Sequence, residues 1–390
     1  MFACVLLALM LQGSQLFTDF ISVLERSPIQ DRAPLARAFL EGRQTPLVEQ
    51  DSLLHFVWFG RADSVFVAGA LPGSWQTPVR MNSIPCGEDT SSPALWHRTY
   101  TVPPDSRIEY KFIVDGAYIL DPTNRRTTPP SDFLNSEAAM PKFRMSPLSV
   151  YRPVVPHGTT DTLQFRSKDT SIAARRIRVY LPPGYDRLKA LPVVYIHDGE
   201  TAFQYTFFAN IIDNLIADGQ IRPIIAVFVP PVERQNEYAG LKTPAYISAF
   251  CDELIPLIDR SFRSSRKAGE RGVMGISNGG HIALTMAVVR PDRFGCVAGQ
   301  SSTISPILRT ALVVRQQSSP LPRTMKIWID CGSLDIIDGD YTFAKLNREF
   351  SEELTRYGIP HRYREVHDGH DWASWRERTP EILRFFFARQ

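Results

Sequence analysis

At 390 residues the chain exceeds the size at which one hydrophobic core usually stops growing, about 250–300 residues, so at least two domains are expected. Hydrophobic residues make up 44% and charged residues 22%, the balance of a globular protein without compositional disorder. Lys and Arg number 44 against 41 Asp and Glu, and the excess of +3 forms no basic block, which argues against nucleic acid as a partner.

The chain begins with the apolar run Phe2–Leu11. This run is too short to span a bilayer, which needs about 20 residues, but it suits the core of a signal peptide. No Lys or Arg precedes it and no A-x-A cleavage pattern follows it, so a helix docked on the protein is the alternative. We predict a signal peptide over residues 1–15 and a periplasmic or secreted protein without a membrane span, with a cytoplasmic protein as the alternative.

Two pattern types follow before residue 147. Over residues 16–47 the apolar residues recur at helical spacing, with a break at Ser27-Pro28, which predicts two amphipathic helices. Over residues 48–146 short alternating runs are separated by Gly, Pro, Asn and Ser: LLHFVWF, SVFVAGA, WHRTYTV and RIEYKFIV. Evenly spaced short strands of this kind predict an immunoglobulin-like β-sandwich.

Residues 147–158 are rich in proline and are predicted to be a linker. In residues 159–390, nearly continuous apolar strands, such as LPVVYIHD, PIIAVFVPP and MKIWIDCG, alternate with helical stretches. The predicted helices are Phe207–Asp218, Tyr246–Ser261, Asn278–Arg290 and Tyr341–Tyr357. Strands of this composition indicate a mostly parallel sheet covered on both faces, so the fold class is α/β.

The five cysteines are too widely spaced for a CxxC pair or a Cys/His cluster: Cys4, Cys86, Cys251, Cys296 and Cys331. Neither a zinc site nor a disulfide framework is indicated, so we expect free thiols. Cys296 and Cys331 lie in strand-like runs and are expected to be buried. No metal or organic cofactor is implied.

The strongest catalytic signal is the segment Gly275-Ile276-Ser277-Asn278-Gly279-Gly280. It follows a short apolar strand and precedes a helix, which is the context of a nucleophile elbow. A Gly-x-Ser-x-Gly turn needs small neighbours so that the serine hydroxyl stands at the carboxyl edge of the sheet. We therefore predict Ser277 to be a nucleophile.

A serine nucleophile needs a base, and the base needs an orienting acid. His370 lies in a polar loop before the last helix, with His367 as the alternative base. Asp335 follows the strand Met325–Cys331 and is the predicted acid. Asp338 and Asp340 are its alternatives, and any of the three could instead cap the next helix. The order Ser, Asp, His is the order that α/β hydrolases use.

Ester hydrolysis passes through a tetrahedral oxyanion that needs backbone N–H donors. The elbow offers the amide of Asn278. The bend after strand Val193–Ile196 offers the amide of Glu200, with Gly199 as the alternative. His197 precedes this bend and is expected to support the loop rather than act as a base.

These motifs resemble the esterase D and enterochelin esterase-like family of α/β hydrolases, over about residues 179–387. The matching segments are Tyr195–Gly199, Asp252–Pro256, Gly275–Gly280, Pro291–Gly295, Gly369–Trp372 and Trp375-Arg376. The family includes feruloyl and acetylxylan esterases and mycolyltransferases. The resemblance implies a catalytic triad of Ser277, Asp335 and His370, with oxyanion amides from Glu200 and Asn278.

The β-sandwich resembles the glycogen-binding type of carbohydrate-binding module. The matching segments are Val65–Gly69, Gly73–Trp75, Glu109–Gly116 and Asp121-Pro122. The resemblance implies sugar stacking on Trp75 and Tyr118 and polar contacts from Lys111 and Asn135. A tyrosine stands where the family usually has its second tryptophan. A structural role beside the catalytic domain is the alternative, because a lone aromatic in a sandwich usually belongs to its packing.

The leading hypothesis is a serine carboxylic-ester hydrolase for a small acyl or aromatic ester, carbohydrate-linked or not, with polysaccharide as a further partner. The alternative within the same chemistry is a siderophore trilactone esterase, in which Arg234 and Arg376 would bind an anionic catecholate. Acyl transfer is a second alternative. An alternative of another class is a non-catalytic glycan-binding protein on a hydrolase scaffold.

Overall fold

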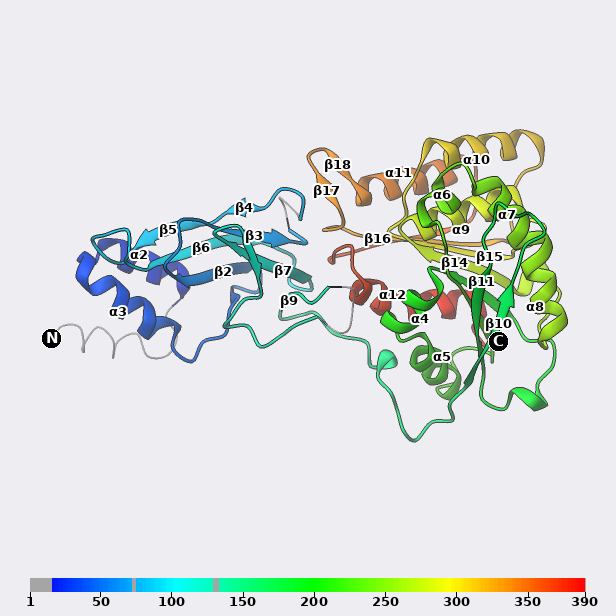
Figure 1. Cartoon of the computed structure of the whole chain (residues 1–390), viewed down its shortest axis with the longest axis horizontal. Coiled ribbons are helices and arrows are strands. Elements are labelled where there is room, and N and C mark those ends of the chain that lie inside the picture. Colours follow the sequence, from blue (N-terminus) through cyan, green and yellow to red (C-terminus); the bar gives the residue numbers. More distant parts are fainter. Residues whose placement is uncertain (1–15, 72–74, 129–132, 390) are drawn as a thin grey trace. The chain divides into compact units, whose positions relative to one another are not determined.

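The computed structural model describes residues 16–71, 75–128 and 133–389, and the contacts within it divide the chain into two units (Figure 1). The first unit comprises the chain up to residue 144 together with residues 336–340 and 367–369, and the second comprises the rest. The predicted signal peptide, residues 1–15, lies outside the described residues. No helix in the described ranges is both long and apolar enough to cross a membrane.

The first unit joins two helices to two antiparallel sheets (Figure 1). The helices are α2 (Phe17–Arg26) and α3 (Ile29–Leu40). One sheet has the order β1 (Leu47–Glu49), β2 (Leu53–Gly60), β6 (Ala94–Thr101), β5 (Asn82–Pro85). The other has the order β4 (Val79–Arg80), β3 (Val65–Gly69), β7 (Arg107–Val114), β8 (Ala117–Ile119), and β9 (Ser136–Ala139) also pairs with β7.

The first unit has three layers, formed by the two helices, the sheet that contains β2 and the other sheet. Successive side chains of β2 point to opposite faces of its sheet and so contact both neighbouring layers. Phe56 points toward the other sheet, where its ring lies 4.6 Å from that of Tyr110. The neighbouring Val57 points the other way and packs in the cluster with α2 and α3, in which the rings of Phe20 and Phe39 stack at 3.9 Å. The two predicted helices therefore cover the outer face of a sheet in a β-sandwich.

The second unit is built on an eight-stranded sheet. Its order is β10 (Thr159–Phe165), β11 (Arg175–Leu181), β13 (Ile225–Val229), β12 (Val193–His197), β14 (Arg271–Ile276), β15 (Cys296–Gln300), β16 (Lys326–Gly332), β19 (Arg362–Val366). Neighbours from β13 to β19 are parallel, whereas β10 and β11 are antiparallel to their neighbours. The short strands β17 (Ile337–Asp338) and β18 (Tyr341–Thr342) follow β16.

Helices cover both faces of this sheet (Figure 1). Val193 and Tyr195 face one core, and Val194 and Ile196 face the other, because successive side chains of a strand point to opposite faces. The first core contains residues of α7 (Thr243–Ala249), α8 (Ile255–Ser261), α9 (Asn278–Val289), α10 (Pro306–Ser318) and α11 (Phe343–Arg356). The second contains residues of α4 (Gly199–Tyr205), α5 (Phe208–Ala217) and α12 (Trp372–Phe387). The α/β class is confirmed.

Other short elements connect these layers. They are α6 (Arg234–Ala239), a π-helical turn (Phe250–Leu254) between α7 and α8, and three 3₁₀ turns at Pro147–Ser149, Tyr185–Arg187 and Ala268–Glu270. The segment predicted as a linker packs on the second unit, because the Asn214 amide of α5 donates to the carbonyls of Leu148 and Val150, each at 2.8 Å. Residues 147–158 are therefore not a free tether.

The four described cysteines are free and buried. Burial raises the pKa of Cys251 to about 12 and that of Cys296 to about 11, so both thiols stay protonated near neutral pH. Within the described ranges, no three His, Cys, Asp or Glu side chains are grouped so that they could hold a metal ion.

Candidate active site

Ser277 lies at the sharp turn between β14 and α9, as the motif predicts. Its backbone has φ 56° and ψ −123°, a strained conformation for a residue other than glycine. A Cβ atom at Gly275 would come within 2.2 Å of the Gly279 carbonyl oxygen, so the turn closes only around glycine. The Ser277 amide donates to the Gln300 carbonyl at 2.9 Å, which ties the turn to β15. The serine is half-buried at the carboxyl edge of the sheet.

Asp335 and His370 form a hydrogen-bonded pair at the same edge. Asp335 follows β16, and His370 lies between β19 and α12, with Nδ1 of the histidine 2.5 Å from Oδ1 of the aspartate. Strands β14, β15, β16 and β19 are consecutive parallel neighbours, so the loops that carry Ser277, Asp335 and His370 share one edge. With Nδ1 engaged by the carboxylate, Nε2 is the nitrogen left to accept the serine proton.

Ser301 and Arg378, which belong to none of the predicted motifs, stabilise the charged form of Asp335. Burial alone would raise the pKa of Asp335. The charge and hydrogen bond of His370, a hydrogen bond from Ser301 and the charge of Arg378 outweigh burial and lower this pKa. The Trp375 indole and the Arg378 guanidinium donate to Ser301 Oγ at 3.0 and 3.3 Å. The Trp375 ring also packs edge-on against the His370 ring, with the ring centroids 4.8 Å apart, so the same group of side chains contacts both Asp335 and His370.

The alternative acids do not share this geometry. Asp340 is exposed in the loop beyond β17. Asp338 ends β17, and its side chain lies outside the described part of the structure. The carboxylate that meets His370 belongs to Asp335, and this contact supports Asp335 as the orienting acid.

The alternative histidines have other partners. His367 Nδ1 lies 2.7 Å from the Asp105 carboxylate within the first unit. His197 is buried, and burial, together with the charges of Arg234 and Arg175, lowers its pKa to about 3. A neutral, buried His197 fits the supporting role predicted for it.

The two predicted oxyanion amides begin helices at the same edge of the sheet. Asn278 is the first residue of α9, and Glu200 is the second residue of α4. N–H groups in the first turn of a helix have no acceptor within that helix. Since β12 and β14 are parallel neighbours, α4 and α9 start side by side. Asp198 has φ 60°, and a Cβ at Gly199 would lie 2.4 Å from the Pro230 nitrogen, so the bend before Glu200 is tightly constrained.

Both arginines predicted to bind an anionic substrate have partners inside the second unit. Arg234 donates through Nε and Nη2 to the Asp198 carboxylate at 2.6 and 2.8 Å. The Arg376 side chain is 3% exposed, donates to the Tyr205 carbonyl at 3.2 Å and lies 4.9 Å from the centre of the Phe207 ring. Burial argues against substrate contact by Arg376, while Arg234 is bound to a carboxylate of the protein.

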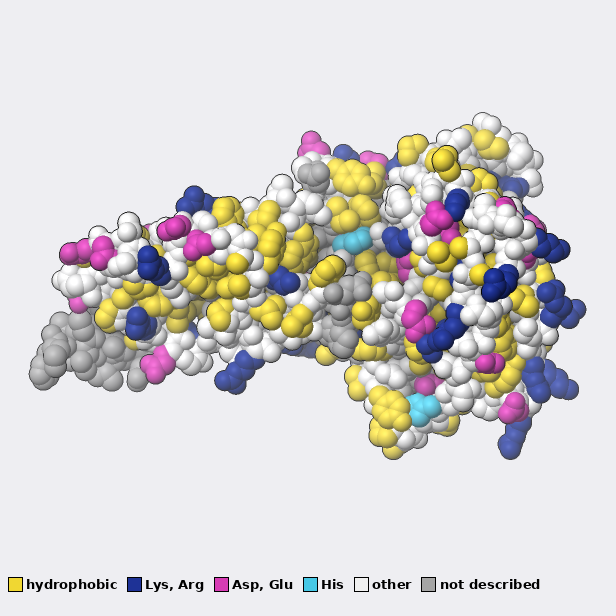
Figure 2. All heavy atoms as spheres, in the orientation of Figure 1, with side chains coloured by type: hydrophobic (Ala, Val, Ile, Leu, Met, Phe, Trp, Pro, Cys, Tyr) yellow, Lys and Arg dark blue, Asp and Glu magenta, His cyan; other side chains and the backbone are white. Residues whose placement is uncertain are grey.

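The four residues predicted to bind glycan differ in their exposure to solvent. Tyr118 pairs with Ile113 of β7 and is 57% exposed, and Lys111 lies two residues from Ile113 and so on the same face. Trp75 is half-buried. Asn135 is buried, and its amide donates to the Glu109 carboxylate at 2.8 Å, so it does not offer a free polar contact. Figure 2 shows hydrophobic side chains gathered over β3 and β7 on the face in view.

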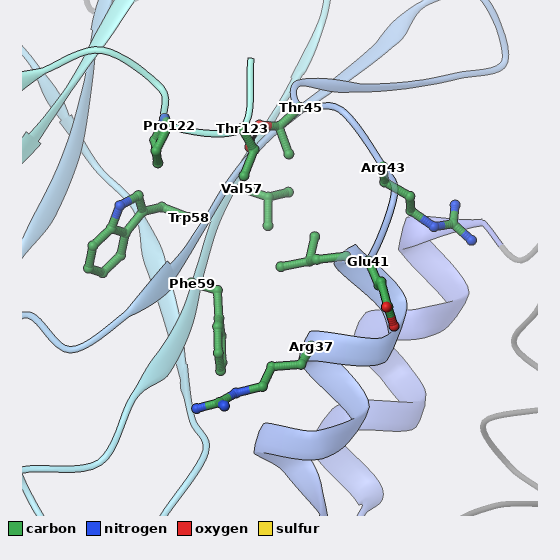
Figure 3. Close-up of a pocket in the computed structure, with 10 residues that line it drawn as sticks. Arg37, Glu41, Arg43, Thr45, Val57, Trp58, Phe59, Pro122 and Thr123 are labelled. Atoms are coloured by element: carbon green, nitrogen blue, oxygen red, sulfur yellow. Dashed lines mark hydrogen bonds between the residues drawn. The ribbon is translucent and has the colours of Figure 1, made fainter. Parts of the chain in front are cut away.

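A pocket of about 410 Å³ lies elsewhere in the first unit, between α3 and β2 (Figure 3). Arg37 of α3 and Val57, Trp58 and Phe59 of β2 contribute to its walls, and the Arg37 guanidinium lies 5.8 Å from the centre of the Phe59 ring. None of the four predicted glycan-binding residues lines this pocket.

Comparison with known proteins identifies the family. Residues 172–386 match the family described as "Putative esterase". The chain belongs to this esterase family. The match covers more than half of the chain and includes Ser277, Asp335 and His370, so the family expected from the sequence is confirmed.

Individual relatives are distant. An endo-1,4-beta-xylanase/feruloyl esterase of Xylanibacter ruminicola is 27% identical over 297 residues, which cover 72% of this chain and 39% of the relative. This chain therefore spans about two fifths of the length of that relative. An uncharacterized protein of Bacillus subtilis, YjcH, is 25% identical over 225 residues, which cover 56% of this chain and 93% of the relative.

Solved structures show the same fold. An enterobactin esterase from Shigella flexneri superposes with a TM-score of 0.69 at 18% identity, covering 89% of this chain and 97% of that one. A ferulic acid esterase from the anaerobic fungus Anaeromyces mucronatus gives a TM-score of 0.50 at 20% identity, covering 67% of this chain and 96% of that one. These likenesses confirm the α/β-hydrolase esterase fold.

Proposed function

We propose that this esterase hydrolyses a small acyl or aromatic carboxylic ester through an acyl-enzyme on Ser277. The observation that carries the proposal is the 2.5 Å contact between His370 and Asp335 at the sheet edge where the elbow presents Ser277. The sequence match to a protein named feruloyl esterase supports an aromatic acyl group and a carbohydrate-linked ester.

The geometry supports the following reaction. The Ser277 oxygen attacks the ester carbonyl while His370 Nε2 takes its proton, and the Asp335 carboxylate stabilises the imidazolium. The amides of Glu200 and Asn278 bind the oxyanion. When the tetrahedral intermediate collapses, His370 returns the proton to the leaving alcohol. A water molecule then attacks the acyl-enzyme by the same route and releases the acid.

A substrate panel tests this proposal. We would measure hydrolysis of p-nitrophenyl acetate, methyl ferulate, acetylated xylan and ferric enterobactin by the wild-type protein and by Ser277→Ala. We expect turnover of the two small esters by the wild type and a loss of about 10³-fold or more in the variant. Equal rates for both proteins would refute Ser277 as the nucleophile.

The same panel separates the substrate classes. The fold likeness to an enterobactin esterase keeps a siderophore trilactone as the second candidate. Arg234 and Arg376 give it little support, because one is paired with Asp198 and the other is buried. Turnover of ferric enterobactin well above that of methyl ferulate would favour the siderophore.

We propose export on the strength of the apolar run Phe2–Leu11, and N-terminal sequencing of the protein from fractionated cells tests it.

We propose that the β-sandwich contacts polysaccharide, because Tyr118 is exposed and lies on the same face as Lys111. A non-catalytic protein is disfavoured, because all three members of the triad are present at one sheet edge.

A further inference from the structure

Helix α6 contacts both turns that carry the oxyanion amides. We infer that α6 holds these two turns in register and that Arg234 is a positioning residue of the oxyanion hole rather than a substrate ligand. The inference rests on the proposed function, since it assumes that Glu200 and Asn278 bind the oxyanion. All of the contacts that α6 makes to these turns lie within the second unit.

Arg234 joins the first turn to the elbow. Its Nε and Nη2 atoms donate to the two carboxylate oxygens of Asp198 at 2.6 and 2.8 Å, a bidentate geometry that fixes orientation as well as distance. The same Nη2 lies 3.4 Å from the carbonyl oxygen of Ile276, the residue before Ser277. The Asp198 side chain is 7% exposed and its φ is 60°, so the carboxylate that Arg234 neutralises belongs to a buried, strained bend.

Two further residues of α6 complete the arrangement. The Tyr238 hydroxyl, fully buried, accepts a hydrogen bond from the Asp198 amide at 3.0 Å. The Gln235 side chain accepts one from the Asn278 side-chain amide at 2.8 Å. One helix thus binds the bend before Glu200 through Arg234 and Tyr238, and the elbow through Arg234 and Gln235.

The spacing between the turns is also set by packing. A Cβ atom at Gly279 would lie 2.7 Å from an Asp198 carboxylate oxygen, so this carboxylate rests against the first turn of α9. If Arg234 no longer neutralised it, the buried charge of Asp198 would favour a move toward solvent. The Glu200 amide would move with it, and a displacement of about 1 Å at a reacting centre can cost about 10²-fold in rate.

The test compares three variants with a matched control. Arg234→Gln, Asp198→Asn and their combination remove the pair from one or both sides. The control is Arg290→Gln, which breaks another bidentate Arg–Asp pair, with Asp252 at 3.0 and 2.9 Å, at the far end of α9. For each variant we would measure kcat and KM on neutral p-nitrophenyl acetate, and the inhibition constant of a trifluoromethyl ketone whose adduct carries an oxyanion.

We expect these variants to bind the transition state more weakly while binding the substrate almost normally. Arg234→Gln should lower kcat by about 10²-fold and weaken the ketone to a similar extent, with KM changed by less than about twofold. The double variant should be no worse than the worse single variant, because the two residues act as one unit. Arg234→Lys should be more active than Arg234→Gln but less active than the wild type. Its single ammonium nitrogen cannot reproduce the two parallel hydrogen bonds that the guanidinium donates to Asp198. Arg290→Gln should match the wild type.

Other outcomes would overturn it. A normal kcat in Arg234→Gln, whatever its KM, would contradict a positioning role for Arg234. Additive losses in the double variant would contradict a shared role of Arg234 and Asp198. Should Arg234→Gln fail to fold, Tyr238→Phe removes only the hydroxyl that anchors the Asp198 amide. It should still lower kcat and weaken the ketone by about tenfold, and a wild-type result would refute the inference. An inactive Ser277→Ala beside a normal Arg234→Gln would leave the proposed function standing while this inference fails.

Discussion

Among single residues, the proposed reaction depends most on the buried carboxylate of Asp335. Asp335 is fully buried and contacts His370, while Ser301 and Arg378 favour its ionised form. Replacing Asp335 by Asn keeps the shape but removes the charge that stabilises the imidazolium. We expect Asp335→Asn to lower kcat by about 10⁴-fold, measured on p-nitrophenyl acetate.

The matched controls for that change are Asp338→Asn and Asp340→Asn in the same loop. Both should keep activity near the wild-type level, because the structure pairs His370 with Asp335. If Asp338→Asn proves the damaging change, the acid has been assigned to the wrong carboxylate.

Ser301 stabilises the charged form of Asp335, so replacing Ser301 should lower the free energy of unfolding by an amount that depends on pH. Ser301→Ala leaves the Trp375 indole without its acceptor, so we expect a loss of about 1–3 kcal/mol in the free energy of unfolding. Because the native pKa of Asp335 is lowered, the stabilisation it provides is complete above its ordinary pKa and disappears as the pH falls through the lowered value. The loss in Ser301→Ala should therefore be larger at neutral pH than below about pH 4.

Urea unfolding of wild type and variant across this range provides the measurement. Ser318→Ala, on the exposed end of α10, is the control and should be neutral. A loss that does not change with pH would show that Ser301 acts through Trp375 and not through the ionisation of Asp335.

At the scale of elements, the elbow is constrained by glycine. Gly275→Ala would place Cβ 2.2 Å from the Gly279 carbonyl oxygen, which is backbone and cannot turn aside. We expect Gly275→Ala to reduce both esterase activity and the free energy of unfolding, the latter by about 1–3 kcal/mol. Gly269→Ala, which has open space around its Cβ, should change stability by less than about 0.5 kcal/mol. Equal thermal unfolding of the two variants would contradict the steric account.

Much of the fold could be predicted because its strands carry strong patterns. The runs that became β12, β13, β14 and β16 are buried on both faces, so they read as continuous apolar segments. The edge strands β10 and β19 were missed, because their side chains are largely exposed or polar. Helix α10 was missed as well; it buries only Leu308 and Leu312 and has a weak apolar stripe.

The site could be predicted only in part. Ser277, Asp335 and His370 follow strands in a characteristic order, so their motifs are visible along the chain. The supporting contacts join residues far apart in sequence, such as Arg234 with Asp198 and Ser301 with Trp375. Such pairs leave no local pattern, so the sequence indicates a substrate contact for Arg234 and gives no sign of its bond to Asp198.

For the whole molecule, we expect glycan binding by the first unit and ester hydrolysis by the second to be separable. If Trp75 and Tyr118 bind glycan, the double change Trp75→Ala and Tyr118→Ala should weaken retention on amylose or xylan. Hydrolysis of a small soluble ester should stay unchanged, because Ser277, Asp335 and His370 all lie in the second unit. Affinity electrophoresis and a p-nitrophenyl acetate assay measure the two effects. Unaltered retention would make the sandwich a structural module.

Covalent labelling can identify the nucleophile of this esterase, which we propose to be Ser277. A fluorophosphonate transfers its phosphonyl group to an activated serine hydroxyl with loss of fluoride, so the label identifies the reacting residue. We would treat wild type, Ser277→Ala and Asp335→Asn with the reagent and map the label by mass spectrometry of peptides. We expect one label on Ser277 in the wild type, much slower labelling of Asp335→Asn and no label in Ser277→Ala. A wild-type protein that stays unlabelled, or a label on another residue that persists in Ser277→Ala, would contradict this assignment.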